Sequence, residues 1–274
     1  MRILRIGAVL LFAVCLVLNI LGNARYKSRQ DTTAPVIESD TDHLELSVAQ
    51  GTDGLTRGLT AWDKEDGDLT DNILVASTSY FVEKGTIRVS YVVFDNGHNF
   101  GTYAREVTFT DYESPRFSLD QPLVFYRGEN IRYLNYIHAA DSLEGDISGQ
   151  IKVISADISN YTAGVYPVVL EVGNSYGDRV QVQLSVVVKD TSFRGPEITL
   201  KQYIVYVKQG ARFDPTALVQ SVRAYGTGES ISTGEVMILG SVDTDTPGCY
   251  QLAYTCVRDG QEGRAYLTVV VEGE

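Results

Sequence analysis

The chain repeats a proline-headed pattern about every 80 residues, and this period limits the possible folds more than any other feature of the sequence. Three segments begin with Pro35, Pro115 and Pro196, which are spaced 80 and 81 residues apart, and a short polar stretch precedes each of them. Proline cannot donate a hydrogen bond to a sheet, so it suits the first residue of a strand. The period therefore predicts three modules of one fold, joined by tight linkers.

Each repeat contains a glycine followed by apolar residues at alternate positions, the pattern of a strand with one face on a core. The glycines are Gly85, Gly164 and Gly248. The residues that follow them are Ile87, Val89, Tyr91 and Val93; Tyr166, Val168, Leu170 and Val172; and Tyr250, Leu252, Tyr254 and Cys256. We predict an all-β chain with one small β-sandwich in each of residues 31–112, 113–192 and 193–274. The short linkers favour a semi-rigid, end-to-end rod.

An acidic turn, residues 61–70, precedes the alternating strand of the first repeat and reads Ala-Trp-Asp-Lys-Glu-Asp-Gly-Asp-Leu-Thr. It resembles the A-x-D-x-x-D-G-D-L/I/V-T signature of bacterial surface immunoglobulin-like domains, the group that includes the Ig-like module of pesticidal crystal proteins. Residues 91–95, Asn99 and Arg105 resemble a second motif of that family, Y-x-V-x-D…G-N…R. The second repeat keeps part of the acidic turn and the third lacks it. The resemblance implies three tandem immunoglobulin-like β-sandwiches in an extracellular array, and it implies no reaction.

Residues 1–30 form a basic leader around an apolar run. The run from Ile6 to Leu21 is 16 residues long and is interrupted only by Asn19. As a helix it is about 24 Å long, short of a hydrocarbon core of about 30 Å unless the flanking basic side chains extend to the interface. One interpretation is a signal anchor, which holds a single-pass protein in the cell membrane through residues 6–21 with extracellular C-terminal domains. The other is a cleaved signal and a secreted protein. We expect the anchor.

The rest of the chain is strongly acidic. The leader holds five basic residues and no acidic one, which leaves 18 basic and 35 acidic residues and a net charge of −17 in residues 31–274. Such a surplus repels phosphate backbones, so we expect no nucleic-acid partner. An extracellular protein or a glycan is the expected partner.

The acidic turn is also a candidate metal site. Closely spaced carboxylates in an irregular loop supply the oxygen ligands that Ca²⁺ prefers. The candidate ligands are Asp63, Glu65, Asp66 and Asp68. The turn is not an EF-hand loop, because Trp62 stands where that loop needs its first acidic residue. The alternative is a metal-free turn in which the aspartates accept hydrogen bonds from nearby backbone amides. Calcium is the only cofactor that the sequence suggests.

The sequence lacks the usual carriers of catalysis, and we predict no catalytic residue. HExxH, CxxC, P-loop and GxGxxG motifs are absent, and the three histidines lie far apart. Cys249 and Cys256 are seven residues apart in one predicted strand, too far for a disulfide. We expect a non-enzymatic protein that acts in adhesion, in ligand display or as a spacer. The alternative is an extracellular module that binds carbohydrate or a cell-wall polymer.

Aromatic residues are expected mainly in the cores. The alternation places Tyr91, Tyr166, Tyr250 and Tyr254 on the core face of their strands. Trp62, the sole tryptophan, is predicted to lie buried or half-buried at a strand end.

Overall fold

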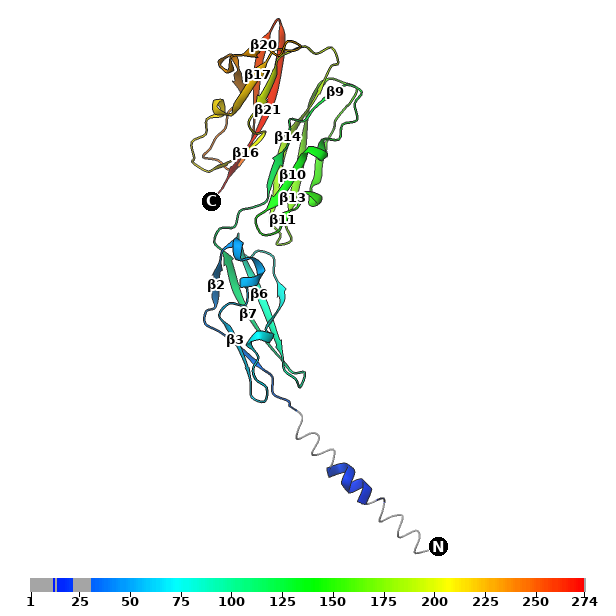
Figure 1. Cartoon of the computed structure of the whole chain (residues 1–274), viewed down its shortest axis with the longest axis vertical. Coiled ribbons are helices and arrows are strands. Elements are labelled where there is room, and N and C mark those ends of the chain that lie inside the picture. Colours follow the sequence, from blue (N-terminus) through cyan, green and yellow to red (C-terminus); the bar gives the residue numbers. More distant parts are fainter. Residues whose placement is uncertain (1–11, 13, 22–30, 274) are drawn as a thin grey trace, which may run out of the picture. The chain divides into compact units, whose positions relative to one another are not determined.

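The computed structural model describes residues 12, 14–21 and 31–273, and these are built mainly of strands (Figure 1). The strands form six sheets within the described residues. The chain divides into two compact units, residues 1–111 and 112–274, and each is described by itself below. The predicted all-β fold class is confirmed, and the sheets are consistent with immunoglobulin-like β-sandwiches.

Most of the predicted leader lies outside the described residues. Residue 12 and residues 14–21 are helical. Among the residues that the structure describes, no helix combines the length and the apolar character needed to cross a membrane.

The first unit packs a three-stranded sheet against a four-stranded one. The first sheet has the order β1 (Val36–Ser39), β3 (Leu59–Asp63), β4 (Gly67–Asp68). The second has the order β2 (His43–Leu46), β7 (Phe100–Phe109), β6 (Thr86–Phe94), β5 (Leu74–Thr78), with two short 3₁₀ helices, η1 (Val48–Gly54) and η2 (Thr70–Asn72). Ile87, Val89, Tyr91 and Val93 are each 0% exposed, as the alternation of β6 predicts.

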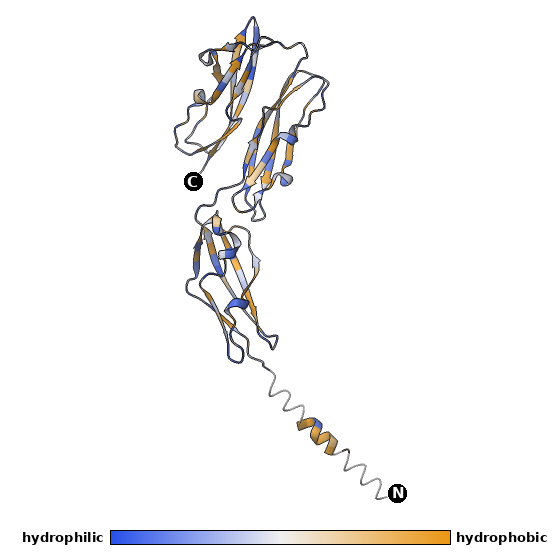
Figure 2. Ribbon diagram, viewed as in Figure 1, coloured by the Kyte–Doolittle hydropathy of each residue, from blue (hydrophilic) through white to orange (hydrophobic). Residues whose placement is uncertain are grey.

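The second unit repeats this arrangement twice. The second repeat has the sheets β8 (Arg116–Leu119), β10 (Ile137–Asp141), β11 (Gly145–Asp146) and β9 (Val124–Tyr126), β14 (Arg179–Lys189), β13 (Gly164–Gly173), β12 (Lys152–Ala156), with η3 (Tyr133–Tyr136) and η4 (Ser148–Gln150). The third has β15 (Glu197–Leu200), β17 (Val219–Arg223), β18 (Ser230–Ile231) and β16 (Ile204–Lys208), β21 (Gln261–Glu272), β20 (Gly248–Arg258), β19 (Met237–Leu239), with η5 (Pro215–Leu218) and η6 (Thr233–Glu235). Hydrophobic and hydrophilic residues are interleaved along these strands (Figure 2). The sequence period thus corresponds to a repeated sheet order.

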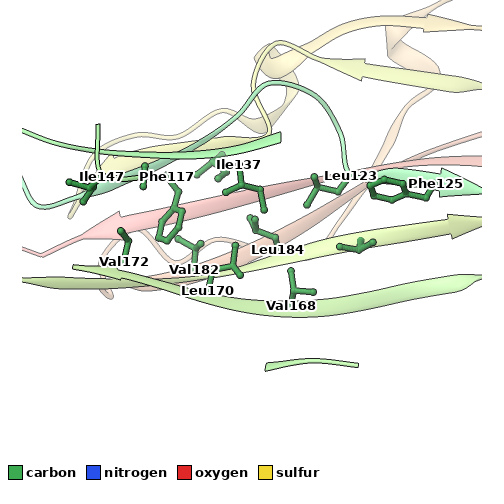
Figure 3. Close-up of a cluster of buried hydrophobic side chains, with 13 residues drawn as sticks. Phe117, Leu123, Phe125, Ile137, Ile147, Val168, Leu170, Val172, Val182 and Leu184 are labelled. Atoms are coloured by element: carbon green, nitrogen blue, oxygen red, sulfur yellow. The ribbon is translucent and has the colours of Figure 1, made fainter. Parts of the chain in front are cut away.

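Inside the second unit, the second and third repeats share a core. Figure 3 shows the 13 buried side chains that form the core of the second repeat. One of them, Ile204, belongs to the third repeat, and Tyr206 and Val270 of the third repeat pack against the same cluster. The hydroxyl of Thr268 in β21 donates to the carbonyl of Gln183 in β14, at 2.8 Å. These two repeats therefore lie along each other, and the end-to-end rod predicted from the linkers is wrong for this pair.

A glycine in β7 lets the opening proline of the first repeat pack directly on this strand. A Cβ placed on Gly101 would lie 2.0 Å from the carbonyl oxygen of Pro35, and one on Gly263 would lie equally close to that of Pro196. Gly101→Ala is therefore expected to push residues 31–35 away from β7 and to lower the stability of the first unit by about 1–3 kcal/mol, measured by thermal denaturation. Gly149→Ala is the control, because no atom lies within 4 Å of its Cβ position. Equal falls in melting temperature in the two variants would contradict a specific contact between Gly101 and Pro35.

Candidate functional site

The acidic turn closes the hairpin between β3 and β4, and Asp63 is its buried member. Asp63 is only 2% exposed. Its Oδ1 accepts hydrogen bonds from the backbone N–H of Glu65, at 2.8 Å, and of Asp66, at 3.0 Å. Aspartate favours this turn geometry, so the expected turn forms. The other oxygen, Oδ2, is buried and has no hydrogen-bond partner.

Two further carboxylates lie beside Asp63. Asp66 follows it in the turn, and Asp31 comes from the segment that precedes β1. One carboxylate oxygen from each of the three residues lies within 4.8 Å of the others. Asp31 reaches the turn because β1 pairs with β3, with Val36 opposite Trp62. Three acidic side chains from two separate segments therefore converge on one point.

Asp31 also carries a buried oxygen without a partner. Its Oδ1 accepts from the hydroxyl of Thr33, at 2.6 Å, and from the amide of Thr33, at 2.9 Å, whereas Oδ2 has no hydrogen-bond partner. The hydroxyl and then the amide of Thr33 lower the pKa of Asp31, which keeps this carboxylate ionised at neutral pH. Among the described residues, no salt bridge involves Asp31, Asp63 or Asp66. The cluster is thus a concentration of negative charge without an ion pair to a protein cation, and the more distant Lys64 acts on Asp31 only through its charge.

The turn between β6 and β7 holds this cluster from the other side. Asp66 accepts from the backbone N–H of Asn96 at 2.8 Å and from its side-chain amide at 2.6 Å. Asp95 is 6% exposed and accepts from the backbone and side-chain N–H of Asn99, both at 2.8 Å. The side chain of Asn99 also donates to the carbonyl of Asp31, at 3.3 Å. Asn96 and Asn99 of the β6–β7 turn thus hold the carboxylate of Asp66 and the backbone of Asp31 in place.

The other two predicted ligands, Glu65 and Asp68, play different parts. Glu65 is exposed, and its carboxylate lies 2.6 Å from the hydroxyl of Thr33. Asp68 is exposed and accepts from the amide of Thr70 at 2.9 Å, and hydrogen bonds from Thr70 lower the pKa of Asp68. Sequence reasoning missed Asp31, because strand pairing alone brings it to Asp63, 32 residues along the chain.

The second repeat has the same turn, with Asp141 in the place of Asp63. Asp141 is 4% exposed, and its Oδ1 accepts from the amides of Leu143 and Glu144, at 2.9 and 3.1 Å. Its Oδ2, however, accepts from the side-chain amide of Asn174, at 3.0 Å. Asn174 occupies the position that Asp95 has in the first repeat. The buried carboxylate of the second repeat is therefore satisfied at both oxygens.

A tyrosine completes this second turn. The amide of Asn174 also donates to the hydroxyl of Tyr112 at 2.8 Å, and this hydroxyl donates to Asp178 at 2.8 Å. Burial, together with the nearby carboxylates of Asp178 and Asp141, raises the pKa of Tyr112, so the hydroxyl keeps its proton.

The third repeat has Ala224 after β17, at the position that Asp63 has after Trp62 in β3 of the first repeat. Only the first repeat therefore leaves this turn incomplete within the described residues.

The second unit contains a pocket of about 300 Å³ between its two repeats. Strands β9 and β14 line it on one side, and β15 and β21 on the other. Its aromatic residues are Tyr126, Tyr203 and Tyr266, and its charged residues are Lys189, Glu197 and Arg264. Burial lowers the pKa of Lys189. An apolar pocket with a few polar groups is suited to a small ligand or to one unit of a polymer.

The aromatic predictions were partly right. Tyr91 and Tyr254 are 0% exposed, whereas Tyr166 and Tyr250 are half-buried. The prediction for Trp62 is wrong, because it is 63% exposed on the outward face of β3, between the buried Ala61 and Asp63. Cys256 is buried and Cys249 exposed, and both are free thiols as predicted.

Comparison with known proteins gives distant similarity only. No family model matches the chain. The pesticidal crystal protein Cry22Aa of Bacillus thuringiensis is 26% identical over 224 residues, which are 79% of this chain and 30% of that protein. The chain therefore spans less than a third of the length of this relative. The similarity agrees with the resemblance noted in the acidic turn, and it does not assign a family.

Solved structures resemble the chain weakly. The Drosophila N-cadherin EC1-3 structure has a TM-score of 0.31 and 12% identity, covering 87% of this chain and 99% of that one. The CBM51-2 and INT domains of Clostridium perfringens ZmpB, in complex with GlcNAc, have a TM-score of 0.24 and 14% identity, covering 87% of this chain and 44% of that one. At these TM-scores the likeness supports no inference about function.

Proposed function

We propose that the chain is a non-enzymatic cell-surface protein, a membrane-tethered array of three immunoglobulin-like domains that acts in adhesion, in ligand display or as a spacer. Residues 1–30 are the proposed signal anchor, and residues 31–112, 113–192 and 193–274 are the proposed domains. The repeated sheet order supports this division, and the apolar run with basic flanks supports the anchor. If the leader is cleaved, the same array is secreted.

The pocket in the second unit is the observation that carries a binding role. Its two walls are joined by a shared core, so the pocket is pre-formed, which lowers the entropic cost of binding. Tyrosine offers a stiff apolar face with a polar tip, which suits both sugars and proteins. Three tyrosines beside charged hydrogen-bonding groups favour a second candidate function, the binding of a carbohydrate or a cell-wall polymer.

An array of glycans and cell-wall polymers, probed with the purified chain in detergent, tests this candidate. Tyr266→Ala is expected to weaken binding about tenfold, the effect of about 1.4 kcal/mol from one aromatic contact. The matched control is Tyr161→Ala, because Tyr161 is 76% exposed and does not line the pocket. No binding to any polymer would reject the carbohydrate function and leave the spacer. Equal losses of binding affinity in Tyr266→Ala and Tyr161→Ala would place the binding site outside the pocket.

A further inference from the structure

We propose that the first repeat binds one Ca²⁺ through Asp31, Asp63 and Asp66. The ion then fastens residues 31–35 to the β3–β4 turn, which Asn96 of the β6–β7 turn holds through Asp66. This site goes beyond the proposed function, because an array of sandwiches needs no ion to display a ligand or to act as a spacer.

The first argument is geometric. Oxygen atoms that bind one Ca²⁺ at about 2.4 Å lie at most about 4.8 Å apart. The three carboxylate oxygens lie within 4.8 Å of one another. Gly97, in the β6–β7 turn, leaves the room that Asp31 needs, since a Cβ there would lie 3.1 Å from the Cβ of Asp31. The two hairpins and the segment before β1 thus form a cradle of the right size for one ion.

The second argument comes from the unpaired oxygens. A buried carboxylate is costly unless each oxygen is paired with a donor or a cation. The turn amides satisfy Oδ1 of Asp63, and Thr33 satisfies Oδ1 of Asp31. Oδ2 of each residue is buried and has no partner. The turn therefore accounts for the burial of Oδ1 of Asp63, which accepts two amide hydrogen bonds. It does not account for the burial of Oδ2, which is free to bind a cation.

The third argument is the comparison with the second repeat. The same turn occurs there with the same pair of amide hydrogen bonds to Asp141, but Asn174 donates to the second oxygen. The first repeat has Asp95 at that position, which is an acceptor and cannot do so. The chain therefore contains one version of the turn in which both oxygens of the buried aspartate accept hydrogen bonds, and one in which Oδ2 has no donor.

Calcium binding has a structural consequence for the start of the sandwich. Without the ion, the three carboxylates repel one another, and Asp31 is the one whose segment belongs to neither hairpin. With the ion, Asp31 is bound to Asp63 and Asp66 of the β3–β4 hairpin. We therefore expect calcium to slow amide hydrogen exchange in residues 31–34, including the amide of Thr33 that donates to Asp31.

Isothermal titration of CaCl₂ into the chelator-treated chain in detergent tests the proposal. The expected result is one Ca²⁺ per chain. Asp63→Asn and Asp31→Asn are each expected to weaken binding at least about tenfold, because each removes one charged ligand. Asparagine keeps the Oδ1 that accepts the turn amides, so these variants should fold. Asp68→Asn is the matched control, because it removes the same charge from the same turn at a residue outside the cluster.

Four results would overturn the proposal. One is the absence of binding by the unaltered chain at millimolar calcium. Another is a loss of calcium affinity in Asp68→Asn as large as that in Asp31→Asn, which would indicate general attraction of cations to an acidic surface. The third is calcium-dependent slowing of amide hydrogen exchange in residues 31–34 that persists in Asp63→Asn. Asp141→Asn, in the second repeat, is expected to leave calcium affinity unchanged. A loss of calcium affinity in this variant would place the site in the second repeat and contradict the proposal.

Discussion

Replacing Arg105 by alanine is expected to destabilise the first unit by about 3 kcal/mol, one of the two largest effects we predict. Arg105 is 3% exposed, and its guanidinium donates to the carbonyls of Leu55 and Arg57, at 2.9 and 2.5 Å. It also donates to Ser39 at 3.0 Å and to the hydroxyl of Tyr91 at 3.3 Å. Its removal leaves the carbonyl of Arg57 without this donor and takes one of two donors from the carbonyl of Leu55, which also accepts from the hydroxyl of Tyr91. A buried acceptor left without a donor costs about 1–3 kcal/mol.

Calorimetry of the purified chain measures this effect, as a fall of about 10–20 °C in the transition of the first unit. Arg88→Ala is the matched control, because Arg88 lies on the neighbouring strand β6 and is exposed. Arg105→Leu adds a second comparison, since the corresponding residues of the other repeats are Leu184 and Leu267. Leucine fills the space but donates no hydrogen bond, so its effect should be smaller than that of alanine. Equal midpoints for Arg105→Ala and Arg88→Ala would contradict the assigned role.

Truncation of Tyr206 to alanine is expected to destabilise the second unit by about 3 kcal/mol and to divide its unfolding into two transitions. Tyr206 belongs to β16 of the third repeat, yet its ring packs on the core of the second. Its hydroxyl accepts from the backbone N–H of Phe117 at 2.6 Å, and the guanidinium of Arg116 lies 5.0 Å from the ring centre. Burial raises the pKa of Tyr206 to about 12, so the hydroxyl is neutral at physiological pH.

The same calorimetric experiment resolves this prediction. The unaltered second unit is expected to unfold in one transition, because its two repeats share a core and the ion pair between Arg116 and Glu272, at 2.8 Å. Tyr206→Phe keeps the ring and should cost only about 1 kcal/mol for the lost hydroxyl. Tyr225→Ala, at a residue that is 42% exposed, is the control in the third repeat. A single transition with an unchanged midpoint in Tyr206→Ala would show that the two repeats are stabilised independently of this contact.

The fold class was predictable because its signals are local. A strand with one face on a core alternates polar and apolar residues, and Ile87, Val89 and Val93 in β6 display this within seven residues. Residue type misled at Trp62, where a large aromatic residue occupies the outward face. Residue type indicated burial there, but the register of β3 placed the side chain in solvent.

The candidate site was predictable in part, for a related reason. Asp63 and Asp66 lie in one turn, so their proximity follows from the sequence. Arg105 was noted as part of a motif, but its burial without a carboxylate partner follows only from the path of the segment between η1 and β3, whose carbonyls accept its hydrogen bonds. Asn174 and Tyr112 likewise meet in the second repeat from 62 residues apart.

By itself, the sequence determined the all-β class, the faces of the long strands and the turn that holds Asp63. Each of these depends on residues within a few positions of one another, where backbone geometry dictates which side chains share a face. Only the tertiary structure decided that Asp31 joins the acidic turn and that Ile204 and Tyr206 complete the core of the second repeat. These contacts depend on strand pairing and on packing between sheets, and no local spacing encodes them.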